Sequence, residues 1–143
     1  MADNSDTIIP LTPAEAFKLM QDNPSAMLVD VRSDMEFLMI GHPTGAVHVP
    51  WIDEPDWIIN PDFCKEVRRL LLGRTGGKHS SDAPIMLICR SGNRSDDAAN
   101  ALQAEGLKNL YVINSGFEGP LDENHRRSTV SGWRYDGLPW EQT

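Results

Sequence analysis

The sequence has little cysteine, little positive charge and no long apolar run. Two cysteines in 143 residues, Cys64 and Cys89, are too few for the disulfide framework of a small secreted domain. Thirteen Lys and Arg against 21 Asp and Glu give a net charge of −8, whereas nucleic acids and anionic membranes are bound by basic surfaces. No apolar stretch approaches the roughly 20 residues that cross a bilayer. We therefore expect neither nucleic acid nor a membrane as a partner.

Targeting and metal-binding signals are also missing. The opening residues, MADNSDTIIP, have neither the basic nor the apolar region of a secretory signal, so the expected location is cytoplasmic. The four histidines are not spaced with cysteines as in zinc sites: His42, His48, His79 and His125. We expect no metal and no cofactor. The length and the absence of a linker or repeat predict one domain over residues 1–143.

Short apolar segments alternate along the chain with segments of helical spacing. Thr12, Pro13 and Glu15 have the pattern of a helix start, with a capping threonine, a proline in the first turn and a glutamate that completes a capping box. The expected strands are residues 26–31, 46–50, 85–89 and 110–113. The expected helices run from Thr12 to the stop at Asn23-Pro24 and over residues 33–38, 60–73 and 95–105. This alternation predicts an α/β fold with a parallel sheet covered by helices on both faces.

Two segments are expected to be loops. Residues 73–82 are rich in Gly and Ser and predict a polar surface connection. Residues 118–143 form an extended, loop-rich C-terminal segment, and we expect Trp133 and Trp140 to pack it against the body.

The stretch CRSGNRS, residues 89–95, directly follows the apolar run 85–88. Ligands in open α/β sheets bind at the carboxyl ends of strands, which is where this stretch falls. Successive backbone N–H groups in a tight loop can converge into an anion-binding nest, and the following helix adds its positive end. Gly92 supplies unrestricted φ, and Asn93 tolerates the left-handed region. The predicted binding loop comprises Arg90, Ser91, Gly92, Asn93, Arg94 and Ser95.

The same loop predicts a reactive Cys89. Positive surroundings lower the pKa of a thiol, and Arg90 and Arg94 strengthen this effect and can fork onto an anionic substrate. Asp96 and Asp97 oppose it, and we expect both to point away from the loop. The alternative is that Cys89 is a packed apolar residue, as free cysteines often are. The spacing to Arg94, Gly92 and the helix start favours the reactive interpretation.

At this loop the sequence resembles the rhodanese-like sulfurtransferases, and the resemblance extends over most of the chain. Asp30-Val31-Arg32 followed by Glu36-Phe37 is similar to the family's Asp-x-Arg and Glu-Phe signature. Residues 41–46, GHPTGA, resemble its Gly-His-Ile-Pro-Gly-Ala turn. Residues 89–94 match its active loop, and residues 114–117 fall where a Gly-Gly-Phe-like segment is usual.

The resemblance implies a central five-stranded parallel sheet, and transfer of a sulfane sulfur through a persulfide on Cys89. Residues 90–94 would then cradle the terminal sulfur, with Arg94 closing the loop and Arg90 contacting thiosulfate. Asp30 and Arg32 would support the loop from the protein side. His42 would stabilise its own turn, a catalytic role being the less favoured alternative. The implied partners are thiosulfate or persulfides as donors, and a thiol or a protein as acceptor.

Three features depart from the family pattern. Pro43-Thr44 replaces Ile-Pro in the turn, and Asp96-Asp97 makes the helix start unusually acidic. Residues 118–131 extend the minimal family ending. Within this excursion His125-Arg126-Arg127 is interpreted as a solvated basic patch rather than as a lid over the substrate.

Loop length discriminates between sulfur and phosphate chemistry. Tyrosine phosphatases place five residues between cysteine and arginine, whereas four separate Cys89 from Arg94, which favours a single sulfur atom as the ligand. Two functions remain open. One is a sulfurtransferase that turns over by a ping-pong mechanism, and the other is a persulfide carrier with little turnover that hands sulfur to a protein. Cys64 could act as the resolving thiol of such a relay, although its place in an apolar-faced helix favours a packed side chain. A catalytically dead interaction domain is disfavoured because Cys89 and Arg94 are both present.

Overall fold

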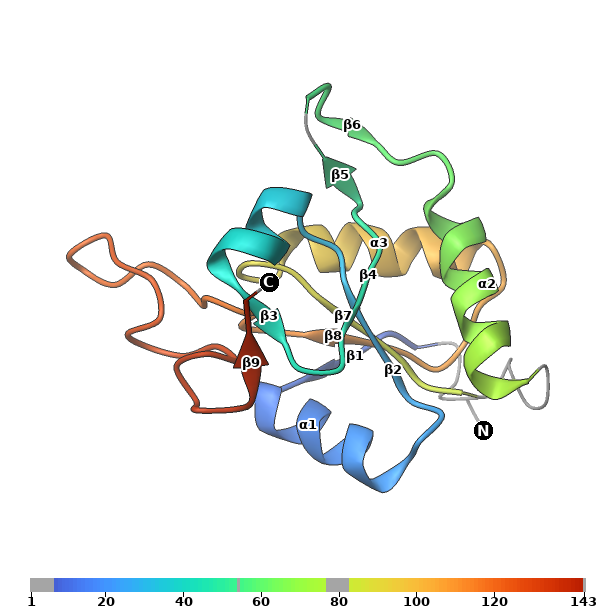
Figure 1. Ribbon diagram of the computed structural model, residues 1–143, viewed down its shortest axis with the longest axis horizontal. Helices are drawn as coiled ribbons and strands as arrows, with labels where there is room; N and C mark the ends of the chain where they lie inside the picture. Colours follow the sequence, from blue (N-terminus) through green and yellow to red (C-terminus); the bar gives the residue numbers. More distant parts are fainter. Residues whose placement is uncertain (1–6, 54, 77–82, 143) are drawn as a thin grey trace.

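The computed structural model describes residues 7–53, 55–76 and 83–142. At its centre lies a five-stranded sheet in which every neighbouring pair is parallel (Figure 1). The strands, in spatial order, are β1 (Ile9–Leu11), β8 (Leu110–Ile113), β7 (Ile85–Ile88), β2 (Met27–Asp30) and β4 (Val47–His48). This confirms the expected five-stranded parallel sheet. No helix in the part of the chain that the structure describes is long and apolar enough to span a membrane.

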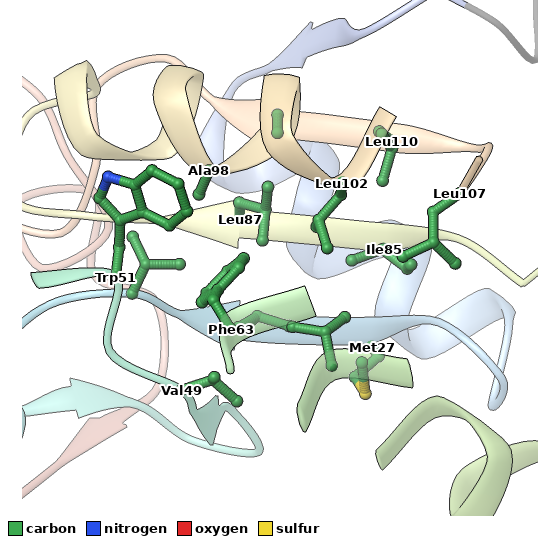
Figure 2. Close-up of a cluster of buried hydrophobic side chains, with 14 of the residues drawn as sticks. Met27, Val49, Trp51, Phe63, Ile85, Leu87, Ala98, Leu102, Leu107 and Leu110 are labelled. Atoms are coloured by element: carbon green, nitrogen blue, oxygen red, sulfur yellow. The ribbon is translucent and has the colours of Figure 1, made fainter. Parts of the chain in front are cut away.

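Helices cover both faces of this sheet, which is why its central strands are apolar at nearly every position. All four residues of β2 and of β7 are buried, and alternate residues enter two different cores. Met27 and Leu87 join α2 (Phe63–Thr75) and α3 (Asn93–Ala104) in one core, which Figure 2 shows. Leu28 and its neighbours on the opposite face pack against α1 (Pro13–Asp22).

Helix α1 begins where the sequence predicts. The side chain of Thr12 accepts a hydrogen bond from the Glu15 N–H (3.2 Å), and that of Glu15 accepts one from the Thr12 N–H (2.8 Å). The helix ends before Asn23. The predicted capping box and stop are thus confirmed.

Three other predicted helices have different bounds. Helix α2 begins at Phe63 and continues through Gly73 to Thr75, so the predicted loop from residue 73 starts too early; its part at residues 77–82 lies outside the described residues. Helix α3 begins at Asn93 and not at Ser95, since Gly92 is its cap. The helix predicted over 33–38 continues further, because residues 36–40 wind as a π-helix, η2 (Glu36–Ile40).

Several strands are too short for sequence periodicity to predict. β1 contains Pro10, which an edge strand tolerates. β5 (Ile52–Asp53) and β6 (Ile58–Ile59) form a two-stranded hairpin. β3 (His42–Pro43) and β9 (Trp140–Glu141) pair antiparallel, so the end of the chain is paired with the turn after η2.

The C-terminal segment packs on the body through its tryptophans, as predicted. Trp133 is fully buried and meets Phe17 of α1 edge-on, with its indole N–H donating to the Pro139 carbonyl (2.8 Å). Trp140 is partly exposed, but its ring lies directly over the Gly41 backbone.

Candidate active site

Cys89 lies at the carboxyl end of β7, almost fully buried. Its Sγ accepts a hydrogen bond from the Gly92 N–H (3.0 Å), which folds the loop back over the sulfur. Gly92 has a φ of +126°, a conformation that side chains rarely adopt, whereas Asn93 is already helical and needs no left-handed tolerance. A hollow of about 230 Å³ opens here, lined by Cys89, Arg90, Ser91, Asn93 and Arg94.

The remaining predicted loop residues lie outside this hollow. Ser95 is fully buried in the first turn of α3, and its Oγ has no hydrogen-bond partner among the residues described. Asp96 and Asp97 are exposed and do not line the hollow, in agreement with the expectation that they point away from it. Among the residues that the structure describes, no carboxylate therefore lines the cup around the sulfur.

Arg94 does not present a free fork to a substrate, in contrast to the prediction. Its Nη1 and Nη2 donate to the two carboxylate oxygens of Glu36 in η2, at 2.6 and 2.9 Å. Burial disfavours the charged form of Glu36, but the hydrogen bond and charge of Arg94, with the Ser33 N–H and Arg32, lower the pKa of that carboxyl to about 2. The hydrogen bond to Glu36 also raises the pKa of Arg94. This ion pair fastens the start of α3 to η2, and Arg90 is left as the exposed arginine of the loop.

The ion pair predicts an acid-dependent loss of stability. In the folded chain the pKa of Glu36 lies below its ordinary value of 4.5. The stabilisation that the ion pair gives to the fold is therefore complete above pH 4.5 and is lost as the pH falls toward 2. Glu36→Gln should therefore lower the unfolding free energy at pH 7, and the gap to the wild type should narrow steadily below pH 4.5. Urea unfolding between pH 7 and pH 2.5 measures this gap. A gap that stays constant over that range would refute the ion pair as its cause.

Asp30 and Arg32 form a second, completely buried ion pair at the end of β2. Arg32 donates to Asp30 through Nε (3.0 Å) and Nη2 (2.7 Å), and Nη2 also donates to the Gly41 carbonyl (2.6 Å). Its guanidinium lies 4.5 Å from the centre of the Phe117 ring. Neither side chain reaches the solvent, so neither is placed to touch a substrate, and their support of the loop stays a prediction.

The segment after β8 holds the loop from behind. The N–H of Phe117 donates to the Cys89 carbonyl (2.8 Å), and those of Glu118 and Gly119 both donate to the Arg90 carbonyl (3.0 and 3.1 Å). Gly116 passes so close that a Cβ there would lie 2.5 Å from the Arg90 carbonyl oxygen. This contact explains why a glycine precedes Phe117.

Gly116→Ala should displace the loop. Gly116 and Gly137 have similar positive φ values, +68° and +76°, but nothing lies within 4 Å of a Cβ at Gly137. Gly137→Ala should thus cost only the backbone strain, about 1 kcal/mol, while Gly116→Ala adds the clash and should cost about 2–4 kcal/mol. Denaturant unfolding compares the two. Equal losses would mean that the close approach at Gly116 is unimportant.

A second, larger hollow of about 540 Å³ adjoins the first, because Arg90 and Arg94 line both. Its other walls come from η2, the β5–β6 hairpin and the C-terminal excursion: Ser33, Met35, Glu36, Ile40, Ile52, Trp57, Glu118 and Arg127. Arg127 was expected in a solvated basic patch together with His125 and Arg126. Those two are exposed, but Arg127 is half-buried and lines the hollow. Sequence spacing gave no signal for this, since it does not specify how a long excursion folds back.

His42 and Cys64 stay outside both hollows. His42 is buried, its ring stacks on Phe37, and its Nδ1 lies 2.9 Å from the Phe37 carbonyl oxygen, which agrees with stabilisation of its own turn. Cys64, in the first turn of α2, packs partly against the core, and burial raises the pKa of its thiol. Within residues 7–53, 55–76 and 83–142, no three His, Cys, Asp or Glu side chains gather as a metal-binding group.

Comparisons with known proteins agree with this geometry. The family model of the rhodanese-like domain matches residues 12–122. A thiosulfate sulfurtransferase, GlpE of Pseudomonas entomophila, is 32% identical over 108 residues, covering 76% of this chain and 80% of that protein. An uncharacterised protein of Rickettsia rickettsii is 31% identical, covering 89% and 92%. The crystal structure of Rv0390 from M. tuberculosis superposes with a TM-score of 0.77 and 36% identity, covering 94% and 97% of the two chains.

Proposed function

Because this chain belongs to the rhodanese-like family, we propose that it is a sulfurtransferase that carries a sulfane sulfur on Cys89. The observation that carries the proposal is the six-residue loop from Cys89 to Arg94, folded so that the Gly92 N–H points at Sγ. The likeness to the GlpE sulfurtransferase supports sulfur transfer in general. The donor is the one that the family resemblance implies, and the sequence of steps follows from the chemistry of a thiolate nucleophile.

In the first half-reaction the Cys89 thiolate attacks the outer sulfur of thiosulfate or of an organic persulfide. The sulfur–sulfur bond of the donor breaks, and sulfite or a thiol leaves with the electron pair. The Gly92 N–H stabilises the Cys89 thiolate, and the exposed Arg90 stabilises the anionic donor and the leaving group. Fixed dipoles and charges lower the barrier of such a step. Arg94 contributes by holding the loop to η2 through Glu36.

In the second half-reaction an acceptor attacks the outer sulfur of the Cys89 persulfide. The bond between the two sulfurs breaks, Cys89 leaves as thiolate, and the acceptor keeps the sulfur. Cyanide serves as an acceptor in an assay and becomes thiocyanate, and a thiol becomes a persulfide.

A carrier that hands its sulfur to a protein is the second candidate. Cys89 is only 1% exposed, and a persulfide so deep in the chain is shielded from bulk thiols. The carrier and the enzyme share the loading step, so they differ in the rate at which the sulfur leaves.

Mass spectrometry of the wild-type protein tests the proposal. Incubation with thiosulfate should add one sulfur atom, located on the Cys89 peptide after digestion, and cyanide should remove it as thiocyanate. Rapid turnover supports the enzyme, and stable loading with negligible turnover supports the carrier. Failure to add sulfur from thiosulfate and from organic persulfides alike would overturn both.

A further inference from the structure

The larger hollow beside Cys89 offers more room than thiosulfate needs. Its volume of about 540 Å³ falls within the ~300–1,000 Å³ typical of sites for organic small molecules. It shares Arg90 and Arg94 with the hollow around Cys89, so the two hollows lie next to each other. Thiosulfate or cyanide would fill only a small part of this space.

One wall of this hollow carries a buried carboxylate, Glu118, with one oxygen that has no hydrogen-bond partner among the described residues. Glu118 is 8% exposed, and its Oε2 makes no hydrogen bond within the described residues. Arg134 forms a long ion pair with Glu118, with Nη2 3.9 Å from Oε1, too far for a hydrogen bond. Because a buried carboxylate oxygen without a hydrogen bond is costly, Glu118 is suited to a ligand that brings a hydrogen-bond donor.

The same excursion supplies a positioned cation. Arg127 Nη1 donates to the Gly119 carbonyl (2.8 Å), which fixes the guanidinium at the wall of the hollow. Neither Arg127 nor Arg90 pairs with a carboxylate in the described ranges of the chain. Guanidinium groups bind carboxylates through parallel hydrogen bonds. The wall therefore offers one site for an ammonium group and one for a carboxylate.

Part of the lining of this hollow is apolar. Met35 and Ile40 come from the η2 region, and Trp57 from the β5–β6 hairpin. Trp57 is held at a φ of +54°, an unfavourable conformation for a bulky residue, and its side chain is largely exposed beside the hollow. Such a wall packs against the carbon chain of an organic ligand.

We propose that this hollow binds a thiol of the amino-acid or short-peptide class, an inference that rests on the proposed sulfur transfer. The carboxylate of the ligand pairs with Arg127 and Arg90, its ammonium group with Glu118, and its sulfur points to Cys89. As acceptor, the thiolate attacks the outer sulfur of the Cys89 persulfide, the enzyme's sulfur–sulfur bond breaks, and a new one forms in the ligand. Cys89 leaves as thiolate, with no net oxidation. The same subsite serves a persulfide donor by the reverse step.

Unloading of thiosulfate-loaded protein by four thiols tests this subsite. Cysteine carries both charged groups, 3-mercaptopropionate only the carboxylate, cysteamine only the ammonium, and 2-mercaptoethanol neither. Arg127→Met should lower kcat/KM for cysteine and 3-mercaptopropionate about 10- to 100-fold more than for cysteamine, the range for losing a hydrogen bond to a charged group. Glu118→Gln should instead lower kcat/KM more for cysteine and cysteamine than for 3-mercaptopropionate. Comparing each thiol between variants cancels its intrinsic reactivity.

Arg126→Met is the matched control, because it removes the same charge from the neighbouring exposed position outside the hollow. It should leave the four rates within about twofold of the wild type. Arg127→Lys keeps the positive charge, so it should recover part of the preference for thiols that carry a carboxylate. This variant tests the subsite independently of whether Glu118→Gln folds. Equal effects on all four thiols, or equal effects of the Arg126 and Arg127 variants, would overturn the subsite. Loading of the wild type by thiosulfate or by an organic persulfide tests the sulfur transfer alone, and failure of both donors would overturn both proposals.

Discussion

Cys89→Ser should abolish sulfur loading, with thiocyanate formation falling at least about 1,000-fold. A hydroxyl at this position stays protonated at neutral pH and forms no persulfide, while it still fits the space of the thiol and accepts the Gly92 N–H. The fold should therefore survive the change. Mass spectrometry after exposure to thiosulfate, together with a cyanide assay, measures both effects.

Cys64→Ser is the matched control for this result. It removes the other thiol of the chain, which lies in the first turn of α2 and outside both hollows. Loading and turnover should stay within about twofold of the wild type. A persulfide that forms in Cys89→Ser but is lost in Cys64→Ser would transfer the proposed chemistry to α2.

Asp30→Asn should be the most destabilising of the changes considered, at about 3–5 kcal/mol. It leaves Arg32 as a fully buried charge without its counterion, and the resulting desolvation cost is not compensated. Adding Arg32→Met removes that charge and should restore a large part of the loss. Guanidinium chloride unfolding of both variants gives the free energies.

The exposed pair of Lys18 and Asp22 provides the comparison. Its nitrogen–oxygen distance, 3.0 Å, is close to that of the buried pair, but both side chains face solvent. Asp22→Asn should change stability by less than about 1 kcal/mol. A similar change for Asp30→Asn would show that burial adds nothing to the pair in β2.

The parts of this molecule that the sequence predicts are those governed by local rules. Buried strands such as Ile85–Ile88 are apolar throughout, and the Thr12 capping box is a local pattern of hydrogen bonds. Cys89 and its loop could be located because the end of a strand and the start of a helix are both local features. The family resemblance added the number of strands in the parallel sheet, five, but neither it nor periodicity located the short β1.

The parts that the sequence did not predict depend on contacts between distant segments. The pairing of Arg94 with Glu36 joins residues 58 positions apart, so its effect on the role of Arg94 was not visible in the spacing of the loop. Arg127 enters the wall of the larger hollow because the Gly119 carbonyl accepts its guanidinium and the excursion folds back. The way in which a long loop folds back on itself leaves no periodic pattern in the amino-acid sequence.

The support of the loop from behind also determines when Cys89 acquires its surroundings during synthesis. The carbonyls of Cys89 and Arg90 accept their hydrogen bonds from residues 117–119, and Gly92 rests against the Asn114 carbonyl. A ribosome adds those residues after the loop itself, so a growing chain carries the thiol before it carries the groups that shape its cup. The nascent protein therefore passes through a stage in which Cys89 lacks the contacts that residues 114–119 supply, and we expect the proposed reactivity toward sulfur donors only after those residues have been added.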